Sequence, residues 1–234
     1  KTGARFAFAD YRKLYQETGE LDNEGFLESA ALVQKAAKYL EQVDGDVYLC
    51  SPKFAAFLLT FTAVHTPTVI FERALLSKET GFDESLVCFE DVDLWFRFAQ
   101  HTQFAFVNEV HALYRRHTES ITATNPLPTK LDGIGVRRTH LNRLRSALSA
   151  TEVAAAKQTI ADLLWDVSYT NWRRGQLKSA RSGFLESWKT KPTRAATVGY
   201  LKAFIPRDLA YAALAFLTHS RPDWGYEPHH LSTR

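Results

Sequence analysis

The chain has 234 residues, 45% of them hydrophobic and 24% charged, and its formal net charge at pH 7 is +3. A chain of this length can bury a sizeable core, and we expect one domain plus an appendage. Its basic residues are mixed with acids and form one dense group, at residues 137–145, which argues against a nucleic-acid-binding protein. Cys50 and Cys88 have no CxxC or Cys/His spacing, so we expect reduced thiols in a reducing compartment.

The beginning of the chain predicts a strand followed by a helix. In residues 4–14, Phe6 and Phe8 alternate with small residues, a pattern that is typical of a strand. Residues 23–43 carry apolar side chains at helical spacing, and Gly45 marks the end of this predicted helix. We therefore expect strands and helices to be mixed in this part of the chain.

Short predicted strands continue to alternate with helices. Apolar runs at residues 47–50 and 68–71 predict buried strands on either side of a helix that begins near Pro52. Residues 91–100 predict a helix with large apolar side chains on its inner side, and residues 104–116 predict a further strand. The fold class indicated by this part is α/β.

The composition then changes, because only helical signals follow Pro128. We therefore expect two domains, an α/β domain over residues 1–125 and an all-α domain over residues 126–234. The predicted helices of the second domain are residues 153–171, preceded by capping-box spacing at residues 149–152, and residues 177–188, stopped by Pro192.

These two helices resemble a degenerate tetratricopeptide hairpin. Gly175, Ala180, Phe184 and Pro192 match its small, aromatic and terminal proline positions. The match occurs once, whereas an array of such hairpins needs about three repeats to be stable. We therefore interpret this hairpin as structural.

Acidic residues stand directly before large apolar ones in the stretch Cys88-Phe-Glu-Asp-Val-Asp-Leu-Trp-Phe-Arg97. In the first turn of a helix, Asp91 and Asp93 are explained adequately by the helix dipole, which favours negative charge there. The neighbouring Phe89 and Trp95 favour a second interpretation, in which at least one carboxylate lies at the margin of an apolar core and accepts a proton. Both interpretations stay open from these residues alone.

A second group of polar residues ends the strand that follows the acidic helix. In Tyr114-Arg-Arg-His117, two arginines could meet a phosphate and the histidine could bind a divalent ion. An exposed basic strand end with a hydrogen-bonded histidine explains the same residues equally well.

Four motifs follow one another in residues 66–122. They are an arginine after a short strand at Arg73, a G-F-D-E turn at Gly81–Glu84, an E-D-x-D-L-W-x-R helix start at Glu90–Arg97, and a Y-R-x-H-x-x-S strand end at Tyr114–Ser120. In this order they resemble the acceptor half of family 2 glycosyltransferases, which have the Rossmann-like GT-A fold. Residues 4–25 also resemble the strand and glycine turn that follow the donor site in that family.

The resemblance implies an enzyme that transfers a sugar, with inversion, from a nucleotide-sugar donor to a hydroxyl of a glycan or lipid-linked acceptor. Asp91 matches the general base, and Glu90 would support it. The implied acceptor-binding residues are Thr66, Gly81, Phe82, Asp83, Glu84 and Trp95, of which Trp95 is expected to lie mostly in the core. The residues implied to contact a metal (Mn or Mg) or the diphosphate are His117, Arg115 and Arg116.

The sequence departs from that family at its beginning. The nucleotide-binding β-α-β half and the D-x-D metal motif should precede residue 4, and neither is present. The first residue is Lys1 and the chain contains no methionine, so we expect it to be part of a longer chain. The divalent metal is accordingly expected for the complete enzyme only. The alternative is a noncatalytic helical adaptor that carries a degenerate glycosyltransferase remnant.

A product that is a surface or secreted glycan implies a cytoplasmic enzyme, with a peripheral position at the inner face of the membrane as a further option. Residues 200–217 mix aromatic and aliphatic side chains with Lys202 and Arg207. Two interpretations of this segment stay open, a membrane-contacting helix and a terminal helix pair that packs on the core. The apolar run at residues 209–217 is too short to span a bilayer.

Overall fold

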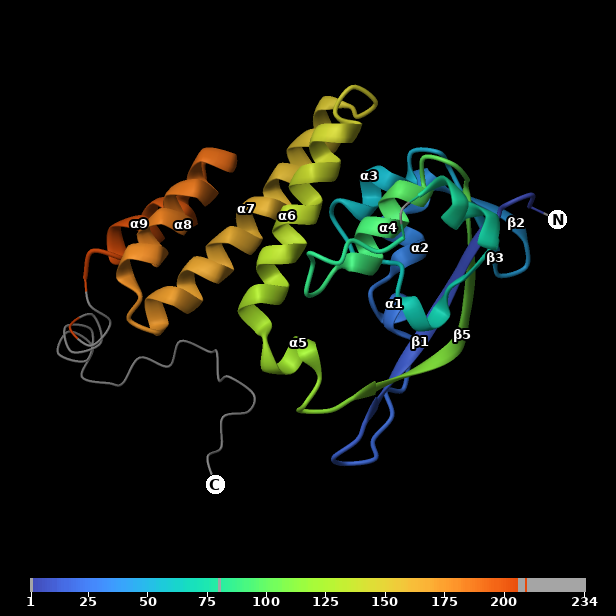
Figure 1. Ribbon diagram of the computed structural model, residues 1–234, viewed down its shortest axis with the longest axis horizontal. Coiled ribbons are helices and arrows are strands. Elements are labelled where there is room, and N and C mark those ends of the chain that lie inside the picture. Colours follow the sequence, from blue (N-terminus) through green and yellow to red (C-terminus); the bar gives the residue numbers. More distant parts are fainter. Residues whose placement is uncertain (1, 80, 206–208, 210–234) are drawn as a thin grey trace. The chain divides into compact units, whose positions relative to one another are not determined.

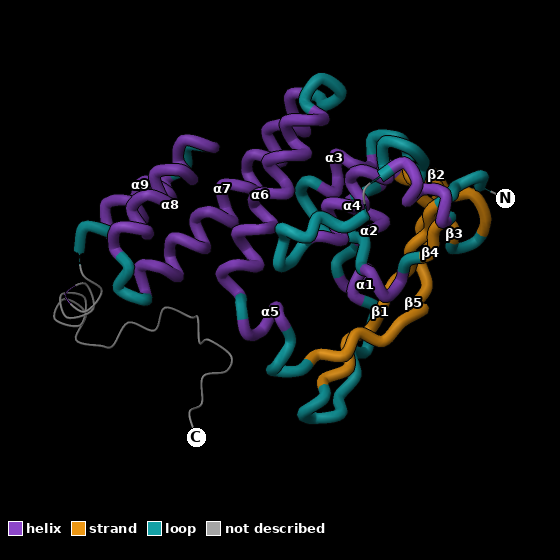
Figure 2. The backbone as a smooth tube through the Cα atoms, viewed as in Figure 1, coloured by secondary structure: helices purple, strands orange, loops and turns teal. Residues whose placement is uncertain are grey.

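The computed structural model describes residues 2–79, 81–205 and 209 of the chain (Figure 1). It divides into two compact units, residues 1–163 and residues 164–234. Strands and helices are mixed in the first unit, and the described part of the second unit is helical (Figure 2). The α/β class that the sequence predicts is therefore confirmed at the level of a mixed sheet with helices.

The first unit contains a five-stranded mixed sheet with the strand order β2-β3-β5-β1-β4 among the described residues. The strands are β1 (Phe6–Tyr15), β2 (Leu40–Asp44), β3 (Val47–Cys50), β4 (Ile70–Phe71) and β5 (Phe104–Arg116). β1 and β5 are parallel from the pair Phe6–Phe104 to the pair Tyr15–Arg116, whereas the other neighbours are antiparallel. The long parallel pair carries the end of β5 to the turn that follows β1.

The core of this unit is built from aromatic side chains on the central strands. Phe6 and Phe8 are each 1% exposed, as their alternation predicts. The ring of Phe6 lies 4.1 Å from that of Phe104 and 5.1 Å from that of Trp95, measured between centroids. Trp95 is 2% exposed and belongs to α4 (Glu90–Phe98), which lies with α3 (Phe54–Leu58) beside the sheet in Figure 1.

The remaining helices of the first unit are short, except for α6. They are α1 (Phe26–Ser29), α2 (Leu32–Lys35), η1 (Ala37–Tyr39), η2 (Thr66–Thr68), η3 (Arg73–Lys78), α5 (Ile121–Thr124) and α6 (Pro126–Leu144). α7 (Ala150–Arg173) then runs across the boundary between the two units.

The prediction of one helix over residues 23–43 is wrong. The chain breaks at Ala31, whose φ of 53° is left-handed, and residues 40–44 form β2 instead. β2 pairs with β3 through a turn in which Gly45 has a φ of 50°. Pairing with a neighbouring strand therefore overrides the helical spacing of the apolar residues.

The start of α1 depends on a buried acid in β1. Asp10 is 2% exposed, and its carboxylate accepts hydrogen bonds from the backbone N–H groups of Leu27 (2.7 Å) and Glu28 (2.9 Å). A Cβ at Gly25 would lie 2.0 Å from Asp10 Oδ2, so only glycine fits beside this carboxylate. Asp10 thereby satisfies backbone donors that the first turn of a helix leaves free.

The second unit contains a helical hairpin with its own core. α8 (Leu177–Thr190) follows Gly175, whose φ is 75°, and α9 (Arg194–Lys202) begins after Thr193, whose side chain accepts the N–H of Ala196. The core is formed by Trp172, Ala180, Phe184 and Ala203. The predicted helix at residues 177–188 and its stop near Pro192 are confirmed.

The boundary between the compact units lies at residues 163/164, whereas the change in composition places a domain boundary at residues 125/126. α6 is grouped with the sheet because it contacts α4. The capping box before α7 is confirmed, since Ser149 Oγ accepts the N–H of Glu152 (3.3 Å) and Glu152 Oε2 accepts the N–H of Ser149 (2.9 Å). Glu152 Oε1 also accepts the hydroxyl of Tyr39 (2.8 Å), which joins α7 to η1.

Most of the segment at residues 200–217, with its two interpretations, lies outside the described residues. Within the described part of the chain, no helix has both the length and the apolar character needed to cross a membrane.

Candidate active site at the start of helix α4

The acidic stretch forms the first turn of α4, as the sequence predicts. Phe89 precedes the helix in a left-handed conformation (φ 67°, ψ 11°), and its carbonyl accepts the N–H of Asp93 (2.9 Å). Successive residues of an α-helix are rotated by about 100°, so residues 91 and 93 point about 200° apart. Asp91 and Asp93 therefore meet different parts of the protein.

Asp91 has an oriented carboxylate that is partly open to solvent. Thr66 Oγ1 donates a hydrogen bond of 2.5 Å to Oδ2, and the N–H of Val92 donates one of 2.7 Å to Oδ1. Thr66 is exposed and lies in η2, which contacts both β1 and β5. Among the described residues, no cation forms an ion pair with Asp91, so its carboxylate is held by hydrogen bonds.

His65 lies directly before Thr66 and packs between aromatic rings. Its ring is 4.8 Å from that of Tyr11 and 5.3 Å from that of Phe26, and its Nε2 lies 3.1 Å from the carbonyl oxygen of Thr62. Burial lowers the pKa of His65, although the negative charge of Asp91 acts in the opposite direction. At pH 7, His65 therefore places a neutral aromatic ring beside the carboxylate of Asp91.

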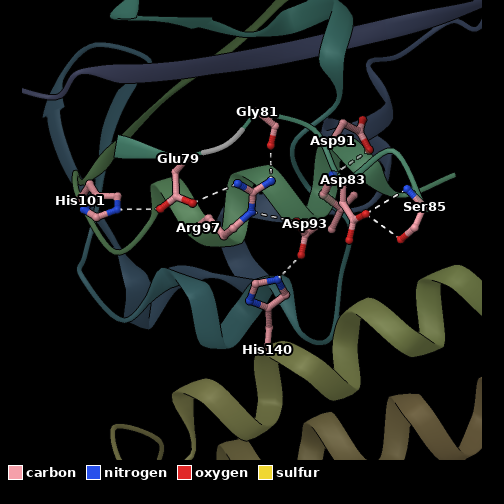
Figure 3. A network of polar contacts seen from close by, with 10 residues as sticks. Glu79, Gly81, Asp83, Ser85, Asp91, Asp93, Arg97, His101 and His140 are labelled. Carbon is pink, nitrogen blue, oxygen red and sulfur yellow. Dashed lines mark hydrogen bonds and ion pairs between the residues drawn. The ribbon is translucent and has the colours of Figure 1, made fainter. Parts of the chain in front are cut away.

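Asp93 is buried and belongs to an ion network on the other side of α4 (Figure 3). Its Oδ2 accepts a hydrogen bond from Arg97 Nε (2.9 Å), and its Oδ1 lies 2.7 Å from His140 Nε2. Burial alone would raise the pKa of Asp93, but the hydrogen bonds of His140 and Arg97 hold it below its ordinary value. His140 is fully buried and its ring stacks on Phe96 at 4.4 Å.

Arg97 extends this network to the segment that precedes the G-F-D-E turn. Its Nη1 donates to Glu79 Oε2 (3.0 Å) and its Nη2 donates to the carbonyl oxygen of Gly81 (2.5 Å). Glu79 also lies 2.8 Å from His101 Nε2. Burial acts to raise the pKa of Glu79, but the hydrogen bonds of His101 and Arg97 bring it below its ordinary value. The turn is therefore tied to α4 by one buried guanidinium.

A groove of about 760 Å³ lies on the same side of α4 as Asp93. Its lining residues include Phe82, Asp83, Glu84, Asp93, Arg97, Gln100, Gly135, Thr139 and Arg143, from the turn, α4 and α6. Phe82 is 51% exposed at this groove, and Asp83 Oδ1 accepts both the N–H (3.0 Å) and the hydroxyl (2.6 Å) of Ser85. The groove thus combines an aromatic ring with planar polar groups, and Asp91 is not among its lining residues.

The structure separates the residues that the resemblance assigns to one site. Thr66 contacts Asp91, whereas Phe82, Asp83 and Glu84 line the groove with Asp93. Trp95 packs against Phe6, Phe71 and Phe98 at 2% exposure, so its expected place in the core is confirmed, and this burial does not support an acceptor-binding role. Glu90 is the first residue of α4, and its supporting role stays a prediction.

The predicted metal or diphosphate residues contact the turn that follows β1. Arg115 Nη1 donates to Gln16 Oε1 (3.1 Å), and the N–H of Thr118 donates to Glu17 Oε1 (3.0 Å). The guanidinium of Arg116 lies 5.9 Å from the ring centroid of Tyr114. Within the described residues, no hydrogen bond or ion pair joins His117 to Asp91.

The described residues also do not fit a metal site. No group of three or more His, Cys, Asp or Glu side chains in this part of the chain could hold a metal ion. His117 contributes to the lowered pKa of Glu17, although the main cause of that lowering is backbone hydrogen bonding. The described residues therefore offer no complete ligand set for Mn or Mg.

Sequence reasoning missed the residues of α6 that reach this region. His140 binds Asp93 across 47 positions of the sequence, and Asp132 accepts the N–H groups of Val87 and Cys88 across 45 and 44 positions. Contacts between such distant residues leave no local periodicity. The arginine of the E-D-x-D-L-W-x-R motif, Arg97, was visible in the sequence, and its position four residues after Asp93 predicts their ion pair.

Comparisons with protein-family models, with curated proteins and with solved structures found no match for this chain. The region has an oriented carboxylate at Asp91, a separate buried ion network at Asp93, and a polar groove beside that network.

Proposed function

We propose that this chain is the acceptor-side part of an inverting family 2 glycosyltransferase with the GT-A fold, and that Asp91 is its general base. The observation that carries the proposal is the state of the Asp91 carboxylate. It is accessible to solvent, it is oriented by Thr66 Oγ1 at 2.5 Å, and no cation among the described residues pairs with it. A general base needs an ionised carboxylate that can approach the hydroxyl whose proton it removes.

The proposed reaction is a single displacement. Asp91 takes the proton of the acceptor hydroxyl while the hydroxyl oxygen attacks the anomeric carbon of the donor sugar. The bond between that carbon and the diphosphate oxygen breaks, and the nucleotide diphosphate leaves with the bonding electrons. Attack from the side opposite the leaving group inverts the anomeric configuration.

Asp93 is a poor candidate for the same role. Both of its carboxylate oxygens are engaged, one by Arg97 and one by His140, and the side chain is buried. Its lowered pKa reflects these partners and makes it a weak proton acceptor. The two aspartates of the motif therefore have separate roles in the proposal, one in chemistry and one in structure.

The groove beside Asp93 is the proposed binding place for the sugar residues of the acceptor. Phe82 offers an exposed ring face, and Glu84, Gln100, Thr139 and Arg143 offer hydrogen-bonding groups. Because Asp91 faces another side of α4, an acceptor in this groove passes the start of α4 to bring its hydroxyl to the base.

The complete enzyme is proposed to take a nucleotide-sugar donor and a glycan or lipid-linked acceptor. Its donor-binding half and the ligands of a divalent metal would come from chain that precedes residue 4. A cytoplasmic position, or one at the inner face of the membrane, supplies such a donor and is part of the proposal.

Complementation in the source organism tests this function without knowledge of the donor sugar. The gene that encodes the chain is deleted, and the surface and secreted glycans are profiled by mass spectrometry with the wild-type gene or the Asp91→Asn gene returned. We expect the wild-type gene alone to restore a missing glycan. Restoration by Asp91→Asn at equal protein level contradicts the proposal and favours a noncatalytic adaptor.

A further inference from the structure

The segment that leads into α4 is held by α6. Asp132 Oδ2 accepts hydrogen bonds from the backbone N–H groups of Val87 and Cys88, each at 3.0 Å. The sulfur of Cys88 lies 3.2 Å from the hydroxyl of Thr129, one helical turn before Asp132. Two neighbouring residues that enter α4 are therefore fixed by one side of α6.

Phe89, the next residue, has an unfavourable backbone conformation. Its φ of 67° lies in the left-handed region, which a bulky residue occupies only when its surroundings impose it. Its ring lies 5.4 Å from the guanidinium of Arg137, and a Cβ at Gly133 would lie 2.9 Å from the ring atom Cζ. Gly133 and Arg137 of α6 thus pack closely on Phe89. Phe89 lies two residues before Asp91.

Arg137 also binds residues 59–62, which lie shortly before Thr66. It is 5% exposed, its Nε donates to the carbonyl oxygen of Leu59 (3.2 Å), and its Nη2 donates to Thr62 Oγ1 (2.9 Å). The carbonyl oxygen of Thr62 in turn contacts His65, the residue before Thr66. Burial lowers the pKa of Arg137 to about 10, so the guanidinium stays charged at pH 7. One face of α6 therefore fixes the residues before Asp91 and the residues before Thr66.

We propose that Asp132, Gly133 and Arg137 are positioning residues for Asp91, which they hold in register with Thr66 through the backbone of residues 87–89 and 59–62. The inference rests on the proposed role of Asp91. It makes α6, which follows the motifs that resemble the glycosyltransferase family, a working part of the catalytic centre. A strained residue that is held from several sides close to a functional group is typical of pre-organised sites.

Asp132 offers the sharpest test because it is only half-buried, so we expect its variants to fold. In the full-length enzyme, Asp132→Ala removes the acceptor of two backbone N–H groups, whereas Asp132→Asn keeps an oxygen that can accept both. Asp162→Ala, at an exposed acid of α7 that accepts a hydrogen bond from Gln158, is the matched control.

We expect Asp132→Ala to lower kcat by about tenfold with little change in the KM of the donor, because misplacement of a catalytic group affects the chemical step. Asp132→Asn should restore most of kcat, and Asp162→Ala should leave it unchanged. Amide hydrogen exchange at residues 87–92 should be faster in Asp132→Ala alone. A kcat of Asp132→Ala equal to that of Asp162→Ala overturns the inference, even if exchange is faster.

The outcome for the base is read separately in the same assay. If Asp91→Asn keeps wild-type turnover, the proposed function fails whatever Asp132 does. If Asp91→Asn is inactive and Asp132→Ala is fully active, only the positioning role is overturned. An equal loss of kcat in Asp132→Ala and Asp132→Asn also overturns it, because the oxygen that Asp132→Asn retains should still accept both backbone N–H groups and preserve kcat.

Discussion

At the scale of single residues, Asp93, Arg97 and His140 hold one another by charge and hydrogen bonds inside the first unit. The distances are 2.9 Å from Arg97 Nε to Asp93 Oδ2 and 2.7 Å between His140 Nε2 and Asp93 Oδ1. His140 Nδ1 is buried and has no hydrogen-bond partner among the described residues. Nε2 is therefore the His140 nitrogen that donates to the Asp93 carboxylate, which accepts.

Asp93→Asn should lower the free energy of unfolding by about 1 to 3 kcal/mol at pH 7, because it removes a charge that two buried partners face. The effect has a defined pH dependence. The pKa of Asp93 is lowered in the folded state, so its contribution is present above the ordinary pKa of about 4 and is lost as the pH falls through the lower folded value. Urea unfolding between pH 7 and pH 3 measures this difference. An unchanged gap between wild type and Asp93→Asn across that range contradicts the account.

At the scale of elements, α6 packs through a glycine on Phe89, the residue that precedes α4. Gly133 faces Phe89, whereas nothing lies within 4 Å of a Cβ built at Gly135, two positions along the same helix. A glycine-to-alanine substitution at these two positions therefore adds the same methyl group, next to Phe89 at one position and in open space at the other.

Gly135→Ala should raise the free energy of unfolding by about 0.5 to 1 kcal/mol, because alanine favours the helical backbone over glycine. Gly133→Ala gains the same helical preference but places its Cβ 2.9 Å from the ring of Phe89, so we expect it to be less stable than Gly135→Ala and than the wild type. Denaturant unfolding of both variants decides the point. Equal stability of the two would show that Phe89 moves aside without cost.

The elements differ in how far their sequence predicts them. β1 follows from the alternation of its apolar residues, β3 from a short apolar run, and β5 and α4 from the pattern of large apolar side chains in their segments. β2 does not, because its exposed residues Glu41 and Gln42 carry no apolar alternation and its pairing with β3 depends on the turn at Gly45. In the candidate site, Thr66 and Asp91 were predicted as members, but their hydrogen bond across 25 positions was not. The contacts of Asp132 and His140 could not be predicted either, because helical spacing alone does not tell which segment a polar residue of α6 meets.

At the scale of the whole molecule, the division of the chain differs from the change in its composition. The composition turns helical after residue 125, yet the compact unit that contains the sheet extends to residue 163. Physical contacts explain the difference, since α6 supplies hydrogen bonds to Val87, Cys88 and Asp93 and the start of α7 bonds to Tyr39. A catalytic part cut at residue 125 would therefore lack the helix that holds α4.

The central claim is that the two aspartates of the acidic stretch have different roles, and turnover measured together with thermal unfolding tests it most directly. In the full-length enzyme, Asp91→Asn should lower kcat roughly a hundred- to ten-thousand-fold with a nearly unchanged Tm, because it removes a base whose hydrogen bonds an amide can largely replace. Asp93→Asn should lower Tm and retain kcat per folded molecule within about tenfold. Near-normal turnover in Asp91→Asn would contradict the account and would leave both carboxylates as the polar start of a helix.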